Sequence, residues 1–406
     1  MTTYPPEFIR AIPKTDLHLH LDGSLRLGTL IELARSRKVE LPSYSEAGLR
    51  ETVFKQRYAD LVEYLQGFAY TCAVLQDAEA LERVSYELAQ DSFADGLRYI
   101  EVRYAPQLHV HDDFSVADVL RSVTRGLSRA RDEINRGEAI RSGQQPRFEF
   151  GIIACAMRMF TGGYSDYFRR FTDVHSYTPT DDIYALASLE LARAVIALRD
   201  REGLPIVAFD LAGAEAGYPA GDHVAAYSYV HKHFMNKTVH AGEAYGPESI
   251  FQAITELHAD RIGHGCHLFS ADLIQSKQIP DRDKYVASLA QFIAERRITL
   301  EVCLTSNSQT IPEFADIRRH PFGKMLEANL SVTLCTDNTL VSNTSVCNEI
   351  AVATRHFEIP PRQLKSLIIY GFKRSFFPGT YQQKRAYVRQ VIDFYEAIAR
   401  RHRIDV

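Results

Sequence analysis

The chain has 406 residues, of which 46% are hydrophobic and 24% are charged, and its formal net charge is −4. This balance is typical of a globular protein and excludes a disordered or fibrous chain. The sequence has no apolar run of the roughly 18 residues that a transmembrane helix needs. Its first residues lack the basic and apolar regions of a secretion signal, so we do not expect export, and no basic stripe of the kind that binds nucleic acid stands out. Six cysteines stand singly, which is typical of a reducing compartment, so we expect a cytoplasmic protein.

Short apolar, β-branched segments alternate with segments of helical periodicity, and no repeat or linker divides the chain. We therefore expect one domain over residues 1–406. Eight segments have the pattern of buried strands: Asp16–Leu21, Leu97–Tyr104, Phe148–Cys155, Leu204–Leu211, Lys237–His240, Arg261–Gly263, Thr299–Leu304 and Ser331–Thr336. This alternation predicts a parallel sheet covered by helices, either an open doubly wound sheet or a closed barrel. The count of eight, with polar residues at the strand ends, favours an α/β fold of the (β/α)₈ TIM barrel type.

The chain is about 150 residues longer than a minimal barrel of this type. Part of the excess is helical, at about 25–95, and we expect it to cap the C-terminal mouth of the barrel. Residues 160–182 are rich in Gly, Tyr and Thr, which predicts a loop. The tail from Arg362 has a helical pattern and a basic end, Arg400–Arg403, which we expect to be solvated. The pair His109 and His111 precedes two aspartates, and we expect it in a surface loop.

The first predicted strand ends in a His-x-His motif formed by His18 and His20. Because side chains alternate along a strand, both imidazoles point to one face, about 7 Å apart along the backbone. Such a pair can converge on one metal ion. Taken alone, however, the motif is explained equally well by two ordinary polar residues at a strand end.

Later strands bring further ligand-type residues to the same predicted edge, namely His240 after the fifth strand and Asp337 after the eighth. Three imidazoles and one carboxylate suit Zn²⁺ with an open position for water. We therefore select His18, His20, His240 and Asp337 as ligands of one Zn²⁺ per chain. Zinc lowers the pKa of a bound water toward about 7, which makes hydroxide available at neutral pH.

Two further residues fall at this edge, His264 at the end of the sixth strand and Glu243 just beyond the fifth. His264 is suited to act as the base that positions and deprotonates the water, with Asp337 helping to orient it. Glu243 is suited to protonate a ring nitrogen of a substrate, provided that burial raises its pKa. The sequence therefore predicts catalytic roles for Glu243, His264 and Asp337.

At this point the chain resembles a known family, the adenosine deaminases of the metal-dependent amidohydrolase superfamily. The motifs that carry the resemblance span nearly the whole chain and follow the order of the family. They are His18–Ser24 (HLHLDGS), Asp210–Gly213 (DLAG), His240–Glu243 (HAGE), Arg261–Gly265 (RIGHG), Val302–Asn307 (VCLTSN) and Thr336–Asn338 (TDN).

The resemblance implies the zinc ligands selected above and a purine nucleoside as substrate. It implies that Glu243 protonates purine N1 and that His264 manages the water that attacks C6. Asp22, with His20 beside it, would bind the ribose 5′-hydroxyl, and the backbone N–H of Gly213 would meet purine N3. Adenosine and 2′-deoxyadenosine would be converted to inosine and deoxyinosine, with release of ammonia, as in purine salvage.

One position departs from the family pattern, because Asn338 stands where the family usually has a second aspartate that bonds purine N7. Purine N7 is an acceptor, so the family aspartate must carry a proton there. An asparagine amide donates a hydrogen bond without any change of protonation. We therefore expect Asn338 to keep this substrate contact.

Other activities are weighed against this one. A binuclear hydrolase would carry a modified lysine at the end of the fourth strand, where this chain has Asp210. An adenine deaminase would be expected to have Glu in place of Asp22, and a nucleotide deaminase would need a cationic phosphate clamp, for which the first loop offers only Arg26. Deamination of a modified nucleoside stays open. A non-catalytic barrel is disfavoured because the acid and the base, Glu243 and His264, are both present.

Overall fold

The computed structural model of the protein describes residues 4–406 and contains one sheet of eight parallel strands. Each strand pairs with its neighbours in the sequence, in the order β1 to β8. The strands are β1 (Lys14–His20), β2 (Leu97–Tyr104), β3 (Glu149–Met157), β4 (Ile206–Ala212), β5 (Asn236–Ala241), β6 (Arg261–His264), β7 (Thr299–Val302) and β8 (Ser331–Leu334). They coincide, within a few residues at each end, with the eight predicted segments.

The first and last strands meet just beyond the C-terminal end of β8, so the sheet closes on itself. Leu19 and Asp337 form a parallel bridge there. The backbone N–H of His20 donates to the carbonyl of Asp337 and the N–H of Asp337 donates to the carbonyl of His18, both at 2.8 Å. The predicted (β/α)₈ TIM barrel is therefore confirmed, and its closure lies among the predicted metal ligands.

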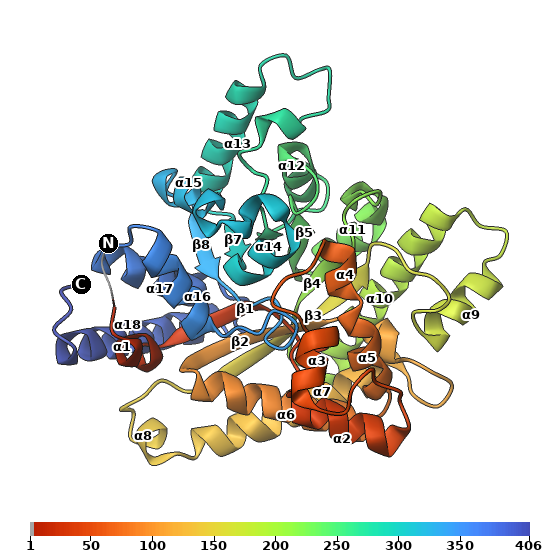
Figure 1. Cartoon of the computed structure of the whole chain (residues 1–406), viewed down its shortest axis with the longest axis horizontal. Coiled ribbons are helices and arrows are strands. Elements are labelled where there is room, and N and C mark those ends of the chain that lie inside the picture. The colour runs from red at the N-terminus through yellow and green to blue at the C-terminus, as the bar shows by residue number, and fades with distance from the viewer. Residues whose placement is uncertain (1–3) are drawn as a thin grey trace.

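Helices surround the barrel and bury apolar faces against it (Figure 1). On α6, for example, Leu81, Val84 and Leu88 are all buried at the spacing of one helical face. The helices that pack on the strands are α6 (Ala78–Ala94), α7 (Val116–Asn135), α10 (Thr180–Glu202), α11 (Val224–Lys232), α12 (Pro247–Thr255), α16 (Val346–His356) and α17 (Pro361–Arg374). The remaining helices that connect or extend them are α1 (Pro6–Ala11), α8 (Glu138–Arg141), α13 (Arg282–Arg296), α14 (Leu304–Thr310), α15 (Phe322–Glu327) and α18 (Tyr381–Arg401).

Four short helices after β1 cover the C-terminal mouth, as the sequence predicts. They are α2 (Leu27–Arg37), α3 (Glu46–Thr52), α4 (Leu61–Leu65) and α5 (Gly67–Val74). The hydroxyl of Tyr58 donates to the carbonyl of Val341 at 2.8 Å, and the Arg50 guanidinium donates to the carbonyl of Leu340 at 3.1 Å. These bonds tie the capping segment to the loop that follows β8.

The prediction that residues 160–182 form a loop is wrong for much of the segment. It contains the helix α9 (Asp166–Val174) and the first turn of α10. The Ser165 hydroxyl accepts from the backbone N–H of Phe168 and so caps α9. Phe168 is buried and stacks on Phe160, with ring centroids 4.0 Å apart, in a small core separate from that of the barrel. Apolar residues at helical spacing therefore outweighed the turn-forming composition of the flanks.

The remaining general expectations have the following outcomes. The tail from Arg362 is helical, as predicted, and forms α17 and α18. All six cysteines are free. Within residues 4–406, no helix combines the length and the apolar content needed to cross a membrane.

Candidate active site

Four side chains that the sequence predicts as metal ligands converge at the C-terminal end of the barrel. His18 and His20 come from β1, His240 comes from β5, and Asp337 follows β8. The distance from His20 Nε2 to His240 Nε2 is 3.3 Å, and Asp337 Oδ1 lies 3.4 Å from His20 Nε2 and 3.5 Å from His18 Nε2. All four side chains are buried.

The ring nitrogens of His20 and His240 face each other across the group. Burial lowers the pKa of His20 and of His240 below the usual value, so these rings are neutral and present lone pairs to each other. His18 Nε2 is buried and has no hydrogen-bond partner among the described residues. A divalent cation between these donors would satisfy all of them at once, and neutral imidazole is the form that binds metal. The residues present therefore fit a metal ion.

Three of these four ligand-type side chains are held by a further polar group. His18 Nδ1 lies 2.8 Å from Glu301 Oε2, and His240 Nδ1 lies 3.1 Å from Asp210 Oδ2. When the Nδ1 of each ring carries a proton and donates it in a hydrogen bond to the carboxylate, the Nε2 of that ring keeps a lone pair that can bind a metal ion. Similarly, the hydroxyl of Ser306 donates to Asp337 Oδ2 at 2.6 Å, which directs Oδ1 toward the imidazoles.

A buried network of charges inside the barrel supports these carboxylates. Arg103 bonds Asp210 at 3.0 Å and Glu301 at 2.8 Å, while Arg261 bonds Glu301 at 2.6 Å and also bonds Glu101. Burial acts to raise the pKa of Glu301, but the two guanidiniums hold it below its usual range. The carboxylates behind the histidines are therefore ionised and fixed in place.

His264 lies beside this group at the end of β6. Its Nε2 is 3.8 Å from Glu243 Oε1, and its Nδ1 is 3.1 Å from the Asn307 side-chain amide. Burial lowers the pKa of His264 well below its usual value, so the ring is neutral and able to accept a proton. His264 and Asp337 both have φ near +63°, a left-handed conformation that strains residues other than glycine by about 1–3 kcal/mol. Such strain is concentrated at functional sites.

Glu243 lies in the loop after β5, and the carboxylate of Glu215 holds that loop. Four consecutive backbone N–H groups, from residues 242 to 245, donate to Glu215 at 2.7–3.0 Å, and the Ser249 hydroxyl donates at 2.6 Å. Burial, with the charges of Asp337 and Glu215, raises the pKa of Glu243 to about 8. Glu243 is therefore protonated at neutral pH, as a general acid must be.

The predicted substrate-binding residues lie around the same site. Asp22 follows β1, and its Oδ1 is buried without a partner among the described residues. Gly213 follows β4 and has a φ of +97°, a conformation that favours glycine. The Asn338 amide donates to the Tyr64 hydroxyl at 2.7 Å, and its Oδ1 has no partner in the described chain. The Asn338 amide packs directly over Gly23, where any side chain would collide with it.

The expectation of a surface loop at His109 is wrong. His109 belongs to a short 3-10 helix (Pro106–His109), its side chain is buried, and neither ring nitrogen has a partner among residues 4–406. Donor atoms of His109, Cys72 and Asp22 lie within 4.8 Å of one another. The residues on either side of His109, Leu108 and Val110, form no periodic apolar pattern from which its burial could be predicted. The burial results from packing of the capping helix α5, which carries Cys72, against His109.

Other residues of the site were missed because their role depends on partners distant in the sequence. Asp210 and Asn307 lie in two of the family motifs, but no sequence pattern assigns a role to them or to Glu215 and Glu301. A signal for Glu301 does exist, since it is an acidic residue in the centre of a short buried strand, Thr299–Val302. Such a charge requires a buried partner. Glu101 and Arg103 both lie in β2, and each pairs with a residue of another strand.

Comparison with proteins of known structure supports the fold. The chain superimposes on an adenine deaminase from Arthrobacter aurescens with a TM-score of 0.72 and 21% identity, covering 95% of this chain and 100% of that one. A zinc-bound amidohydrolase from Burkholderia ambifaria gives a TM-score of 0.76 and 18% identity, covering 100% and 96%. An N6-methyl-AMP deaminase from Arabidopsis thaliana gives 0.71 and 24%, covering 96% and 98%.

Comparison of sequences goes further. The chain is 34% identical over 395 residues to adenosine deaminase 1 of Streptomyces coelicolor, which covers 96% of this chain and 88% of that protein. It is also 34% identical over 390 residues to an adenosine deaminase of Mycobacteroides abscessus, which covers 95% of each. The profile of the family described as adenosine deaminase matches residues 13–172 and 180–394. The chain belongs to the adenosine deaminase family and is a hydrolytic deaminase of purines.

Proposed function

We propose that the protein is a single-domain adenosine deaminase that binds one Zn²⁺ per chain. Adenosine and 2′-deoxyadenosine would react with water to give inosine or deoxyinosine and ammonia, as a step of purine salvage. The free state of the six cysteines supports a cytoplasmic location for this step.

One observation carries this proposal, namely the convergence of the four ligand-type side chains beside a neutral histidine and a protonated glutamate. His18, His20 and His240 supply the imidazoles that zinc prefers, and Asp337 supplies the carboxylate. Zinc held by these residues would lower the pKa of a water molecule to about 7 and so supply the nucleophile.

The remaining chemistry belongs to side chains of this protein. The neutral imidazole of His264 accepts the proton of the attacking water, and Asp337 orients that water. Glu243 donates its proton to purine N1, which makes C6 electron-poor as the C6–O bond forms. The imidazolium of His264 then gives its proton to N6, the C6–N6 bond breaks to release ammonia, and the hydroxyl proton on the C6 oxygen returns to Glu243 as the C6=O bond forms. Burial of both His264 and Glu243 supports these transfers, because it sets each pKa on the side of neutrality that its role requires.

The surroundings of Asp22 favour a nucleoside over a nucleotide. Its partnerless oxygen suits a hydroxyl donor such as the 5′-OH of ribose. The groups beside it are Cys72 and His109, and burial lowers the pKa of His109 to about 4, so neither is positively charged at neutral pH. A phosphate there would face a carboxylate without a cation to offset the repulsion.

Asn338 and Gly213 complete the proposed purine contacts. The Asn338 amide carries two hydrogens, of which one is donated to Tyr64. The second is available for purine N7, and the backbone N–H of Gly213 is proposed to bond N3. Neither the Asn338 amide nor the Gly213 N–H has to change its protonation state to make its contact. The two groups would therefore hold the purine ring equally well across the pH range of the enzyme.

The test is a deamination assay on protein of measured metal content, with and without a chelator. Adenosine, 2′-deoxyadenosine, adenine, AMP and N6-methyladenosine are compared at equal concentrations. We expect rapid, chelator-sensitive turnover of the two nucleosides and at least 100-fold slower turnover of AMP and adenine. Faster turnover of adenine, AMP or N6-methyladenosine than of adenosine would refute the proposed substrate while leaving the deaminase chemistry in place.

A further inference from the structure

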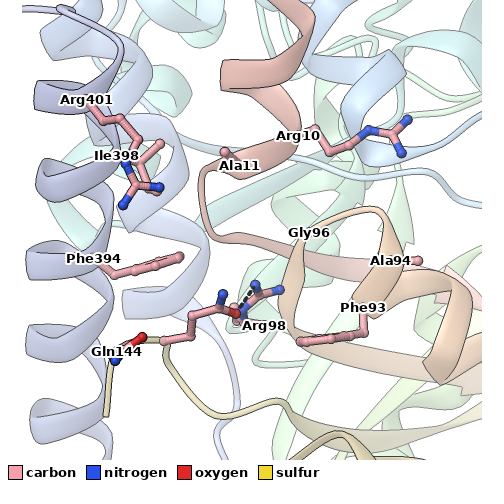
Figure 2. Close-up of a pocket in the computed structure, with 11 residues that line it drawn as sticks. Arg10, Ala11, Phe93, Ala94, Gly96, Arg98, Gln144, Phe394, Ile398 and Arg401 are labelled. Carbon is pink, nitrogen blue, oxygen red and sulfur yellow. Dashed lines mark hydrogen bonds between the residues drawn. The ribbon is translucent and has the colours of Figure 1, made fainter. Parts of the chain in front are cut away.

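A second polar cavity lies at the opposite end of β2 from the proposed active site. It has a volume of about 420 Å³ and is lined by three arginines, Arg10, Arg98 and Arg401, and by no acidic residue. Figure 2 shows the Arg98 side chain between Phe93 of α6 and Phe394 of α18, with Arg10 and Arg401 above it in the view. The cavity is separate from the metal-binding group, because Arg98 is at the start of β2 and the active site is at the C-terminal ends of the strands.

Arg98 is a buried cation without a counter-ion. Only 7% of its surface is exposed, yet no carboxylate of residues 4–406 lies within 4.0 Å of its guanidinium. It donates to the carbonyl of Leu97 at 2.9 Å and to the side-chain oxygen of Gln145 at 3.1 Å, while its Nε has no partner in the described chain. A charge removed from water is costly unless it is paired, so this guanidinium lacks an anionic partner.

The other cations of the cavity are unpaired as well. Arg10 and Arg401 are exposed at its rim, and neither forms an ion pair with a described residue. Lys14 is fully buried behind Gly96, where its ammonium donates only to backbone carbonyls. The lining of the cavity carries three positive charges and no negative one, while the Asp95 carboxylate lies behind it near Lys14, so the lining itself favours an anion.

The cavity also offers apolar surface next to the cations. The ring centroid of Phe93 lies 4.5 Å from the Arg98 guanidinium carbon, and that of Phe394 lies 5.9 Å from it. A bare inorganic anion would fill only a fraction of the volume and would leave both rings uncovered. Cavities of this size normally hold small organic molecules. The ligand is therefore expected to combine an anionic group with a flat apolar portion.

We propose that this cavity binds an organic phosphate of about the size of a nucleoside monophosphate. The phosphate lies against the Arg98 guanidinium and between the guanidiniums of Arg10 and Arg401, and the apolar portion packs on Phe93 and Phe394. Arginine suits this role because its planar donors match phosphate oxygens. The site extends the function beyond deamination, and no step of the proposed reaction uses it.

The test is isothermal titration of the metal-loaded protein with three probes, namely IMP, inorganic phosphate and inosine. IMP and inosine differ only in the phosphate, and neither has a 6-amino group to be removed. We expect one IMP site whose Kd is at least tenfold lower than that for phosphate. We expect the double variant Arg10→Gln/Arg401→Gln to raise this Kd at least tenfold. The matched control is Arg400→Gln, which removes an exposed charge from the same helix outside the cavity and is expected to change the Kd less than twofold.

The outcomes separate this site from the active site. Binding of IMP that survives the double variant would place IMP elsewhere and overturn the proposal. Equal Kd values for IMP and inorganic phosphate would overturn the organic part of it, and absence of IMP binding would overturn it entirely. Adenosine turnover is expected to stay unchanged in the double variant, because both side chains are exposed and lie far from the C-terminal ends of the strands. Arg98→Gln is expected to abolish IMP binding, with the melting temperature reporting whether that variant folds.

Discussion

Replacement of Glu243 by glutamine isolates the proposed proton donor from the metal site. Glutamine has nearly the same shape, so it fits the buried position without leaving a cavity. The loop around Glu243 is held by Glu215 through backbone N–H groups that the substitution leaves untouched. We therefore expect the variant to fold, to retain its metal and to bind adenosine, while losing the proton that N1 must receive.

The size of the loss follows from the role assigned to the side chain. General acid catalysis contributes about 10²–10⁴ to the rate of an enzyme, which corresponds to about 3–5 kcal/mol of barrier at 25 °C. Because burial and the neighbouring carboxylates raise the pKa of Glu243 to about 8, nearly all wild-type molecules carry this proton at pH 7. The full contribution is thus present in the wild type, and kcat is expected to fall at least 100-fold in Glu243→Gln.

The assay follows the absorbance change of adenosine deamination, with metal content measured on the same samples. Glu256→Gln is the matched control, because the substitution is chemically the same but lies outside the site. Glu256 is exposed and directly follows α12. It is expected to keep the wild-type rate. A Glu243→Gln variant with a full complement of metal and a kcat within tenfold of wild type would refute the proton-donor role.

Three further predictions concern the pH profile and neighbouring residues. Because Glu243 acts in its protonated form, kcat/KM is expected to fall as the pH rises through about 8, and a flat profile from pH 7 to 9.5 would contradict this. Glu301→Gln removes a charge that supports His18 and two buried arginines. We therefore expect the metal affinity to fall by about 10–100-fold and the free energy of unfolding to fall by about 3–5 kcal/mol. Metal titration and urea denaturation measure the two quantities, and unchanged values would show that the carboxylate is dispensable. Asp22→Asn is expected to weaken adenosine binding by about 1.5–3 kcal/mol, seen as a higher KM, with little effect on 5′-deoxyadenosine, and equal losses for both would remove Asp22 from the 5′ contact.

The barrel and the cluster of four ligand-type side chains could be predicted because both depend on local patterns. Buried parallel strands appear as short apolar runs, and the residues directly after them must lie at one end of the sheet. His18, His20, His240 and Asp337 follow this rule, and the structure brings their donor atoms together as the spacing predicts. Closure of the barrel is what places Asp337, from the last strand, against His20, from the first.

The parts that could not be predicted depend on contacts between distant segments. Glu301 supports His18 across 283 residues of sequence, and no local pattern assigns that partner. His109 is buried because the capping helices close over its loop, although its neighbours Asp112 and Asp113 indicate a surface position. The helix α9 was missed because turn-forming residues flank it, while its own apolar spacing, centred on Phe168, is only two turns long.

The most direct test of the central claim is a metal titration of the chelated protein with adenosine turnover as the readout. Zinc is removed completely, the loss of metal is verified, and Zn²⁺ is then returned in fractions of an equivalent while the initial rate is recorded. The proposed site predicts no turnover at zero equivalents, a linear rise and a sharp break at one Zn²⁺ per chain. Full turnover by the metal-free protein, or a break at two equivalents, would contradict the account of a single zinc held by His18, His20, His240 and Asp337.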